Sequence, residues 1–276
     1  MKKIILFVLA LCLCFTVFGG AAFAEAAPAE APAAEKPAAE MTAEELYQAG
    51  QQAFDAGDYG KALEYFQLAA DLGNAEGLRG MGYLYSYGLG VEQSPEKAIE
   101  YFQKAADLGD AGSLYNLGVC CYFGSGVETD YVKAAEYFRK AADLGEISSL
   151  NNLGFLYEHG HGVEQDFDQA LKYYRQALDL GEVYAYAGLG SCYFNGHGVE
   201  QDYAKALEYY TLGAEQGVPD AMFGLGNCCY EGKGLEKDPD KAAEWYRKAL
   251  DAGYEPYNEE EQARLKDVLG DDYTTK

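Results

Sequence analysis

The sequence NNLGFLYEHGHGVEQDFDQALKYYRQALDLG, residues 151–181, is one complete copy of a unit that recurs along the chain. In this copy Gly154 is followed by a G-x-G loop, an aspartate and a Gln-Ala-x-x-aromatic-aromatic motif, which reads Lys-Ala in the other copies. Four more glycines occupy the same place at an unbroken interval of 36 residues: Gly82, Gly118, Gly190 and Gly226. A fixed period of this size indicates stacked copies of one supersecondary unit.

Each unit is predicted to contain two helices joined by the G-x-G loop. In residues 111–123, small or apolar side chains follow the i, i+3, i+4 spacing of one buried helical stripe. The second helix has a recurring N-cap three residues before the Lys or Gln: Asp58, Ser94, Asp130, Asp166, Asp202 and Asp238. It has a recurring C′ glycine: Gly73, Gly109, Gly145, Gly181, Gly217 and Gly253. The pattern predicts an all-α chain without strands.

The recurring glycine inside the first helix requires an explanation, because glycine there costs roughly 1 kcal/mol relative to alanine. We expect the missing side chain to admit an aromatic ring from the second helix. The aromatic residues predicted to fill this place are Tyr101, Tyr137, Tyr173, Tyr209 and Trp245.

The chain follows the pattern A-x-x-x-[aromatic or small]-x-L-G-x-x-Y-x-x-G-x-G-V-x-x-D-x-x-K-A-x-x-[YW]-[FY]-x-x-A. With this pattern it resembles the Sel1-like repeat family, which is related to tetratricopeptide repeats. The resemblance covers five repeats of 36 residues in 74–254. Residues 41–73 lack the G-x-G insertion and look like a tetratricopeptide hairpin that caps the array. Residues 255–276 are predicted to form a C-terminal capping helix, with Asn258 and Glu261 as its capping box, and a tail.

This resemblance implies a right-handed α-solenoid of helix-turn-helix repeats that serves as a non-catalytic scaffold for protein–protein interaction. The first helices of such a superhelix line its concave face. A protein or peptide partner is therefore expected to bind there.

The N-terminal sequence predicts that the protein is exported. Lys2 and Lys3 precede an apolar stretch, and the segment ends in Ala-Phe-Ala, so residues 1–24 are interpreted as a signal peptide. Residues 25–40 are almost entirely Ala, Pro and Glu, which is typical of a disordered linker. The mature chain contains no candidate membrane span, and its predicted location is the periplasm or the extracellular space.

The chain is strongly acidic, with a formal net charge of -24 at pH 7. Such a charge repels phosphate backbones, so nucleic acid is not an expected partner, and basic or neutral proteins are preferred. The alternative is that the charge provides only solubility.

Six first-helix residues are predicted to contact a partner. Amide side chains of the column two residues before the recurring glycine can hydrogen-bond an extended peptide, and nearby aromatic rings can anchor side chains. These residues are Tyr83, Tyr87, Asn116, Phe123, Asn152 and Phe155. The competing interpretation is that several of the rings only pack between repeats. Arg79 is the single Lys or Arg on a first helix, so a clamp for a C-terminal carboxylate is not expected.

No catalytic, cofactor-binding or metal site is predicted. The G-x-G loops follow helices rather than strands, which excludes a phosphate-binding loop, and no nucleophile with a partner base is apparent. The three histidines, His159, His161 and His197, lie in or beside these loops, where a metal would need further ligands such as Glu158. The cysteines Cys120, Cys121, Cys192, Cys228 and Cys229 are predicted to be buried free thiols. The alternative functions are an acidic cation-binding protein and an envelope-acting hydrolase.

Overall fold

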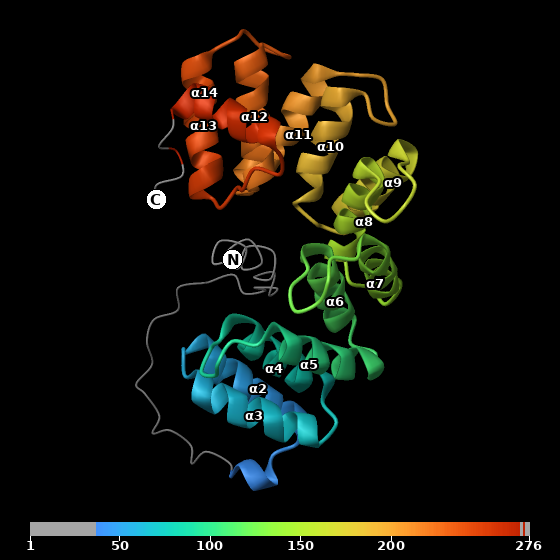
Figure 1. The fold of residues 1–276 in the computed structure, drawn as a ribbon, viewed down its shortest axis with the longest axis vertical. Helices are drawn as coiled ribbons and strands as arrows, with labels where there is room; N and C mark the ends of the chain where they lie inside the picture. The colour runs from blue at the N-terminus through green and yellow to red at the C-terminus, as the bar shows by residue number, and fades with distance from the viewer. Residues whose placement is uncertain (1–36, 271–272, 274–276) are drawn as a thin grey trace, which may run out of the picture. The chain divides into compact units, whose positions relative to one another are not determined.

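The computed structural model describes residues 37–270 and residue 273. In this part of the chain there are thirteen α-helices, one 3-10 helix and no strand, which confirms the predicted all-α class (Figure 1). The predicted signal peptide and residues 25–36 of the predicted linker lie outside the described residues. The linker's last residues differ from the expectation, because Ala38–Glu40 forms a 3-10 turn after Pro37.

Contacts divide the chain into two compact units, Met1–Ser113 and Leu114–Lys276. The described part of the first unit begins with the 3-10 helix and continues with α2 (Ala43–Asp55), α3 (Tyr59–Asp71), α4 (Ala75–Tyr87) and α5 (Pro95–Asp107). Here α2 pairs with α3 and α4 pairs with α5, and α4 also packs against both helices of the preceding pair.

The second unit contains the remaining helix pairs. Its helices are most of α6 (Ala111–Phe123), α7 (Tyr131–Asp143), α8 (Ser148–His159), α9 (Phe167–Asp179), α10 (Ala185–Asn195), α11 (Tyr203–Glu215), α12 (Pro219–Glu231), α13 (Pro239–Asp251) and α14 (Glu259–Leu269). From α7 onward each helix packs against the next, and the first helices α8, α10 and α12 also contact one another in succession. This is the stacking that the 36-residue period predicts.

The predicted helix boundaries are confirmed at both ends of the second helices. All six N-cap side chains accept a hydrogen bond from a backbone N–H in the first turn; Asp166 Oδ1, for example, lies 3.0 Å from the amide nitrogen of Gln169. All six C′ glycines have positive φ angles, between 81° and 98°. A residue with a side chain would be strained in this conformation.

The recurring glycine does admit an aromatic ring, but the predicted column is wrong by one residue. A Cβ built on Gly154 would lie 2.7 Å from the ring of Tyr174, not Tyr173. The rings against the five glycines are Phe102, Phe138, Tyr174, Tyr210 and Tyr246. The neighbouring column faces another way on the helix. Tyr173, for example, stacks on Tyr157 with centroids 5.6 Å apart.

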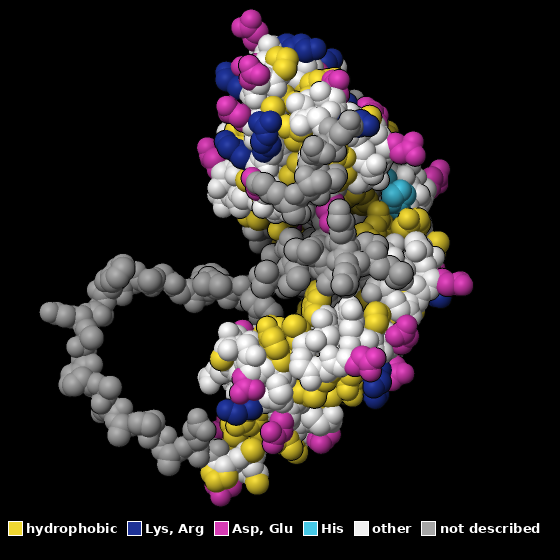
Figure 2. All heavy atoms as spheres, turned by 60° about the vertical axis from the view of Figure 1, so that its left-hand side comes forward, with side chains coloured by type: hydrophobic (Ala, Val, Ile, Leu, Met, Phe, Trp, Pro, Cys, Tyr) yellow, Lys and Arg dark blue, Asp and Glu magenta, His cyan; other side chains and the backbone are white. Residues whose placement is uncertain are grey.

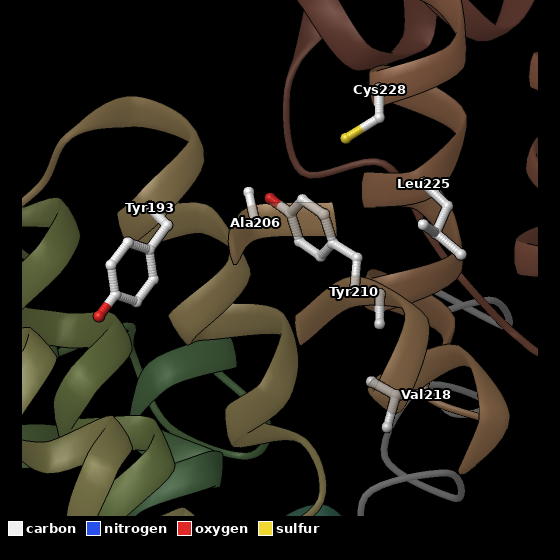
Figure 3. Close-up of a cluster of buried hydrophobic side chains, with 7 residues drawn as sticks. Tyr193, Ala206, Tyr210, Val218, Leu225 and Cys228 are labelled. Carbon is white, nitrogen blue, oxygen red and sulfur yellow. The ribbon is translucent and has the colours of Figure 1, made fainter. Parts of the chain in front are cut away.

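The same ring also contacts a glycine of the following repeat. A Cβ on Gly188 would clash with Tyr174, and one on Gly224 would clash with Tyr210. Each of these rings therefore lies between glycine backbones of two consecutive repeats. Figure 3 shows Tyr210 of α11 beside Leu225 of α12, within a cluster that also includes Val218 and Cys228.

The C-terminal capping helix and the burial of the cysteines largely agree with the predictions. Asn258 accepts a hydrogen bond from the Glu261 amide and starts α14, as predicted. The capping box is only half formed, because the Glu261 carboxylate accepts from the Tyr257 amide and the Tyr254 hydroxyl instead. All five cysteines of the described part of the chain are buried, and Cys121, Cys192, Cys228 and Cys229 are free thiols, in agreement with the prediction.

Candidate functional site

The predicted partner-binding residues fall in both units. Tyr83 and Tyr87 belong to α4 in the first unit, where the Tyr83 ring packs edge-on against Phe102 with centroids 5.6 Å apart. In the second unit Asn116 is buried, with 4% of its surface exposed, and Asn152 is half-buried. Phe123 ends α6 and Phe155 lies in α8.

The structure places Phe123 and Phe155 in one group of rings, which we call the aromatic cluster: Tyr122, Phe123, Tyr131, Phe155, His159 and His161. Tyr122 is at its centre, with its ring centroid 4.9 Å from Phe123 and 6.1 Å from Phe155. Tyr131 is 5.0 Å from Tyr122, and His159 stacks on Phe155 at 4.2 Å. The cluster joins the end of α6, the start of α7 and the end of α8.

A ring from the C-terminal cap extends the cluster. Tyr257 lies 5.8 Å from Phe155 between ring centroids, although the two are far apart in the sequence. Its hydroxyl donates to Asp220 Oδ1 at 2.6 Å and its amide donates to Glu261 at 2.6 Å. These two hydrogen bonds fix the position of the ring. Only tertiary structure brings it to Phe155.

Two loop histidines occupy equivalent positions. His161 stacks on Tyr131 with centroids 4.9 Å apart, and its Nδ1 is hydrogen-bonded to the Tyr122 hydroxyl at 3.1 Å. One repeat later, His197 stacks on Phe167 at 4.1 Å, and its Nδ1 lies 3.1 Å from Glu158 Oε1. Each histidine thus ties its loop to the preceding repeat.

Glu158 is the polar centre of the second of these junctions. It is 5% exposed, and its carboxylate accepts hydrogen bonds from Tyr174, Ser191 and His197. Burial raises its pKa, but the hydrogen bonds from His197, Ser191 and Tyr174, together with the charge of His159, outweigh burial and hold the pKa below its usual range. Since a carboxylate can only accept, His197 Nδ1 carries the proton.

The sequence did not reveal this network. Its only trace is that Glu158 occupies the position of Tyr122 in the preceding repeat and of Phe194 in the following one. A charged residue among aromatic equivalents indicates a local polar partner, but not which one.

The second glycine of the G-x-G loop has a role beyond turning the chain. A Cβ on Gly162 would overlap the backbone of Tyr131, and one on Gly198 would lie 2.6 Å from the Phe167 carbonyl oxygen. The same relationship recurs at Gly234 and Tyr203. This glycine therefore lets the loop approach the start of the preceding repeat's second helix.

Two members of the aromatic cluster, Tyr122 and His161, are neutral near pH 7. Burial, together with the neighbouring Tyr131, raises the pKa of Tyr122 to about 12, so its hydroxyl stays protonated. Burial, and then the adjacent His159, lowers the pKa of His161. The rings thus offer their faces without a positive charge from Tyr122 or His161.

The described residues do not gather the ligands of a metal centre. No group of three His, Cys, Asp or Glu in residues 37–270 is arranged to hold a metal ion. No described helix is long and apolar enough to cross a bilayer. Arg79, the base considered for a carboxylate clamp, pairs with Asp110 at 3.1 Å.

A cavity of about 550 Å³ lies beside α13 and α14. Its walls carry charges of both signs, from Lys237, Arg247, Asp240, Glu244 and Asp267. The walls contain no buried polar group that points to a ligand.

Comparison with known proteins identifies the repeat. The family model for the Sel1 repeat matches six consecutive segments, at residues 37–74, 75–110, 111–146, 147–182, 183–218 and 219–254. Its first match takes in the hairpin that the sequence assigned to a tetratricopeptide-like cap. None of the curated proteins matches the chain.

Several solved structures resemble the chain over most of its length. A Sel1 repeat protein from Oxalobacter formigenes is 32% identical with a TM-score of 0.61, and the match covers 76% of this chain and 86% of that one. The protective antigen c5321 of uropathogenic Escherichia coli is 30% identical with a TM-score of 0.61. That match covers 83% of this chain but only 49% of c5321. The immunity protein Pa5087 from Pseudomonas aeruginosa is 27% identical with a TM-score of 0.51, over 76% and 82% of the two chains.

Proposed function

The chain belongs to the Sel1 repeat family, whose members are generally non-catalytic scaffolds for protein interaction, and from that premise we propose that it holds an extended segment of a partner protein on its first helices. The contact surface is formed by the aromatic cluster with Tyr257. Asn152, on the same helix as Phe155, supplies an amide for the partner's backbone.

The observation that carries this proposal is the exposure of several large rings in one place. Phe123 is 36% exposed, Tyr131 39% and Tyr257 52%. Rings of this kind dominate binding energy at protein interfaces, because they bury a large area with few rotatable bonds. The aromatic cluster spans two consecutive repeats, with Phe123 and Tyr131 in one and Phe155 in the next, and Tyr257 of the C-terminal cap lies beside Phe155, so an extended segment can touch these rings in succession.

The partner is a basic or neutral protein, and nucleic acid is disfavoured. The net charge of -24 supports this preference, since it attracts cationic segments and repels phosphates. The protein acts after export, in the periplasm or outside the cell, as the N-terminal sequence indicates.

Site-specific photo-crosslinking tests the binding surface. We would replace Phe155 with p-benzoylphenylalanine in the full-length protein, irradiate producing cells and identify adducts by mass spectrometry. The matched control places the same group at Tyr65, a half-buried ring on the second helix α3. A defined adduct from position 155 that is missing from position 65 is expected. Equal labelling at both positions, or none, contradicts the proposal.

Export is tested separately. The protein recovered from the envelope or the medium should begin at Glu25. A protein that keeps residues 1–24 in the cytoplasm would contradict this part of the proposal.

A further inference from the structure

The proposed surface has a chemical preference that its rings and charges reveal. The six side chains of the aromatic cluster and Tyr257 include no lysine or arginine. Among the described cation–ring contacts, none includes Tyr122, Tyr131 or Phe155. The faces of such rings carry partial negative charge and attract cations.

A later repeat of the same chain places a cation against the ring that is equivalent to Tyr131. Tyr203 opens α11 as Tyr131 opens α7, and the residue that reaches Tyr203 from the following loop is Lys233. The Lys233 ammonium lies 4.8 Å from the Tyr203 ring centroid and donates to its hydroxyl at 3.0 Å. At Tyr131 the equivalent loop residue is His161, whose pKa burial lowers, so no fixed cation is placed there.

The surrounding charge favours a cation as well. Acidic side chains are spread over the surface visible in Figure 2, and the chain as a whole carries a formal charge of -24. Bringing a positive side chain to the cluster therefore gains long-range attraction in addition to the contact with the rings.

We propose that the aromatic cluster binds an arginine side chain of the partner's extended segment. The guanidinium is planar and weakly hydrated, so it stacks on Tyr122, Tyr131 or Phe155 at a smaller desolvation cost than an ammonium. This inference rests on the proposed function, because it names the side chain that the same surface selects.

A pair of peptides that differ only in charge tests the inference. The probes are fluorescein-labelled twelve-residue peptides, three copies of Gly-Leu-Arg-Ser, and the same sequence with citrulline at each arginine. Citrulline keeps the planar shape but is neutral. Fluorescence anisotropy with the chain from Glu25 onward measures both affinities at 50 mM and 300 mM salt.

The arginine peptide is expected to bind at least about five-fold more tightly than the citrulline peptide, consistent with a cation–ring contact. The preference should shrink at the higher salt concentration. Phe155→Leu and Tyr131→Leu, which keep apolar volume but remove a ring, should abolish the preference, whereas Tyr65→Leu should retain it. Thermal unfolding of each variant verifies that it is folded.

The outcomes separate the inference from the proposed function. Equal binding of the two peptides, or a preference that survives Phe155→Leu and Tyr131→Leu in folded protein, overturns the inference and leaves the scaffold proposal intact. Failure of the arginine peptide to bind also overturns it. The scaffold proposal then depends on the crosslinking result alone.

Discussion

Glu158 accepts a hydrogen bond from His197 Nδ1 at 3.1 Å, one repeat after Tyr122 and His161 make the corresponding contact at the same distance. The two junctions share one geometry but differ in charge. At the first, a neutral phenol faces the imidazole, and at the second a buried carboxylate does. This difference makes the second junction sensitive to acid.

Glu158→Gln should destabilise the protein by about 2–3 kcal/mol near pH 7, because an amide replaces a charged acceptor of three hydrogen bonds. The pKa of Glu158 is lowered on folding, so its ionisation contributes stability above the unfolded-state pKa of about 4.3. That contribution is lost as the pH falls through the folded-state pKa. Urea unfolding should therefore show a difference between wild type and variant that is largest above about pH 5 and shrinks below about pH 4.

The matched control for this prediction is Glu164→Gln, which neutralises an exposed carboxylate. It should change the unfolding free energy by less than about 0.5 kcal/mol at any pH. A Glu158→Gln effect that is independent of pH would argue against a charged carboxylate at the junction.

Gly154→Leu should destabilise the second unit by about 3 kcal/mol or more, through overpacking against Tyr174. Even a Cβ at this place would lie 2.7 Å from the ring. Gly60→Ala in α3 is the control, because its Cβ would meet only Asp58 Oδ1 at 3.9 Å. That change should be neutral or stabilising, since alanine is the better helix former. Thermal unfolding measures both, and an unchanged melting temperature for Gly154→Leu would refute the packing argument.

Gly162→Ala should cost about 2 kcal/mol more than Gly145→Ala, as measured by urea unfolding. Both glycines have positive φ angles, 71° and 92°, so both substitutions carry backbone strain of about 1–2 kcal/mol. A Cβ on Gly145 would meet nothing within 4 Å, whereas one on Gly162 would overlap the Tyr131 backbone. The difference between the two losses in unfolding free energy measures the cost of blocking the close contact between repeats at Gly162. Equal losses would show that this glycine only turns the chain.

The cysteines should be unreactive in the folded protein. Burial raises the pKa of Cys228 to about 12 and also raises the pKa values of Cys192 and Cys121, so little thiolate is present near neutral pH. Titration of the chain from Glu25 onward with a thiol reagent should detect five thiols only after unfolding. Rapid reaction before unfolding, or fewer than two thiols after it, would contradict buried free cysteines.

The residues of the candidate site could be predicted only in part from the sequence. The spacing of Phe123 and Phe155 placed both on first helices, and the structure joins them through Tyr122. The position of Tyr257 could not be predicted, because it depends on how the C-terminal segment folds back toward α8. Likewise Tyr173 and Tyr174 are adjacent aromatic residues, and the sequence pattern favoured the one that does not meet Gly154.

The sequence by itself determined the helix pairs, their boundaries and their repetition. These properties depend on local chemistry: an aspartate or serine that accepts hydrogen bonds from backbone amides at one helix end, a glycine that adopts positive φ at the other, and a spacing that gives each helix one apolar stripe. Tertiary structure decided which ring lies between two glycines, which histidine faces the carboxylate of Glu158 and how Tyr257 reaches Phe155. Those contacts join separate repeats, and their geometry follows from the angle and distance at which the helices pack.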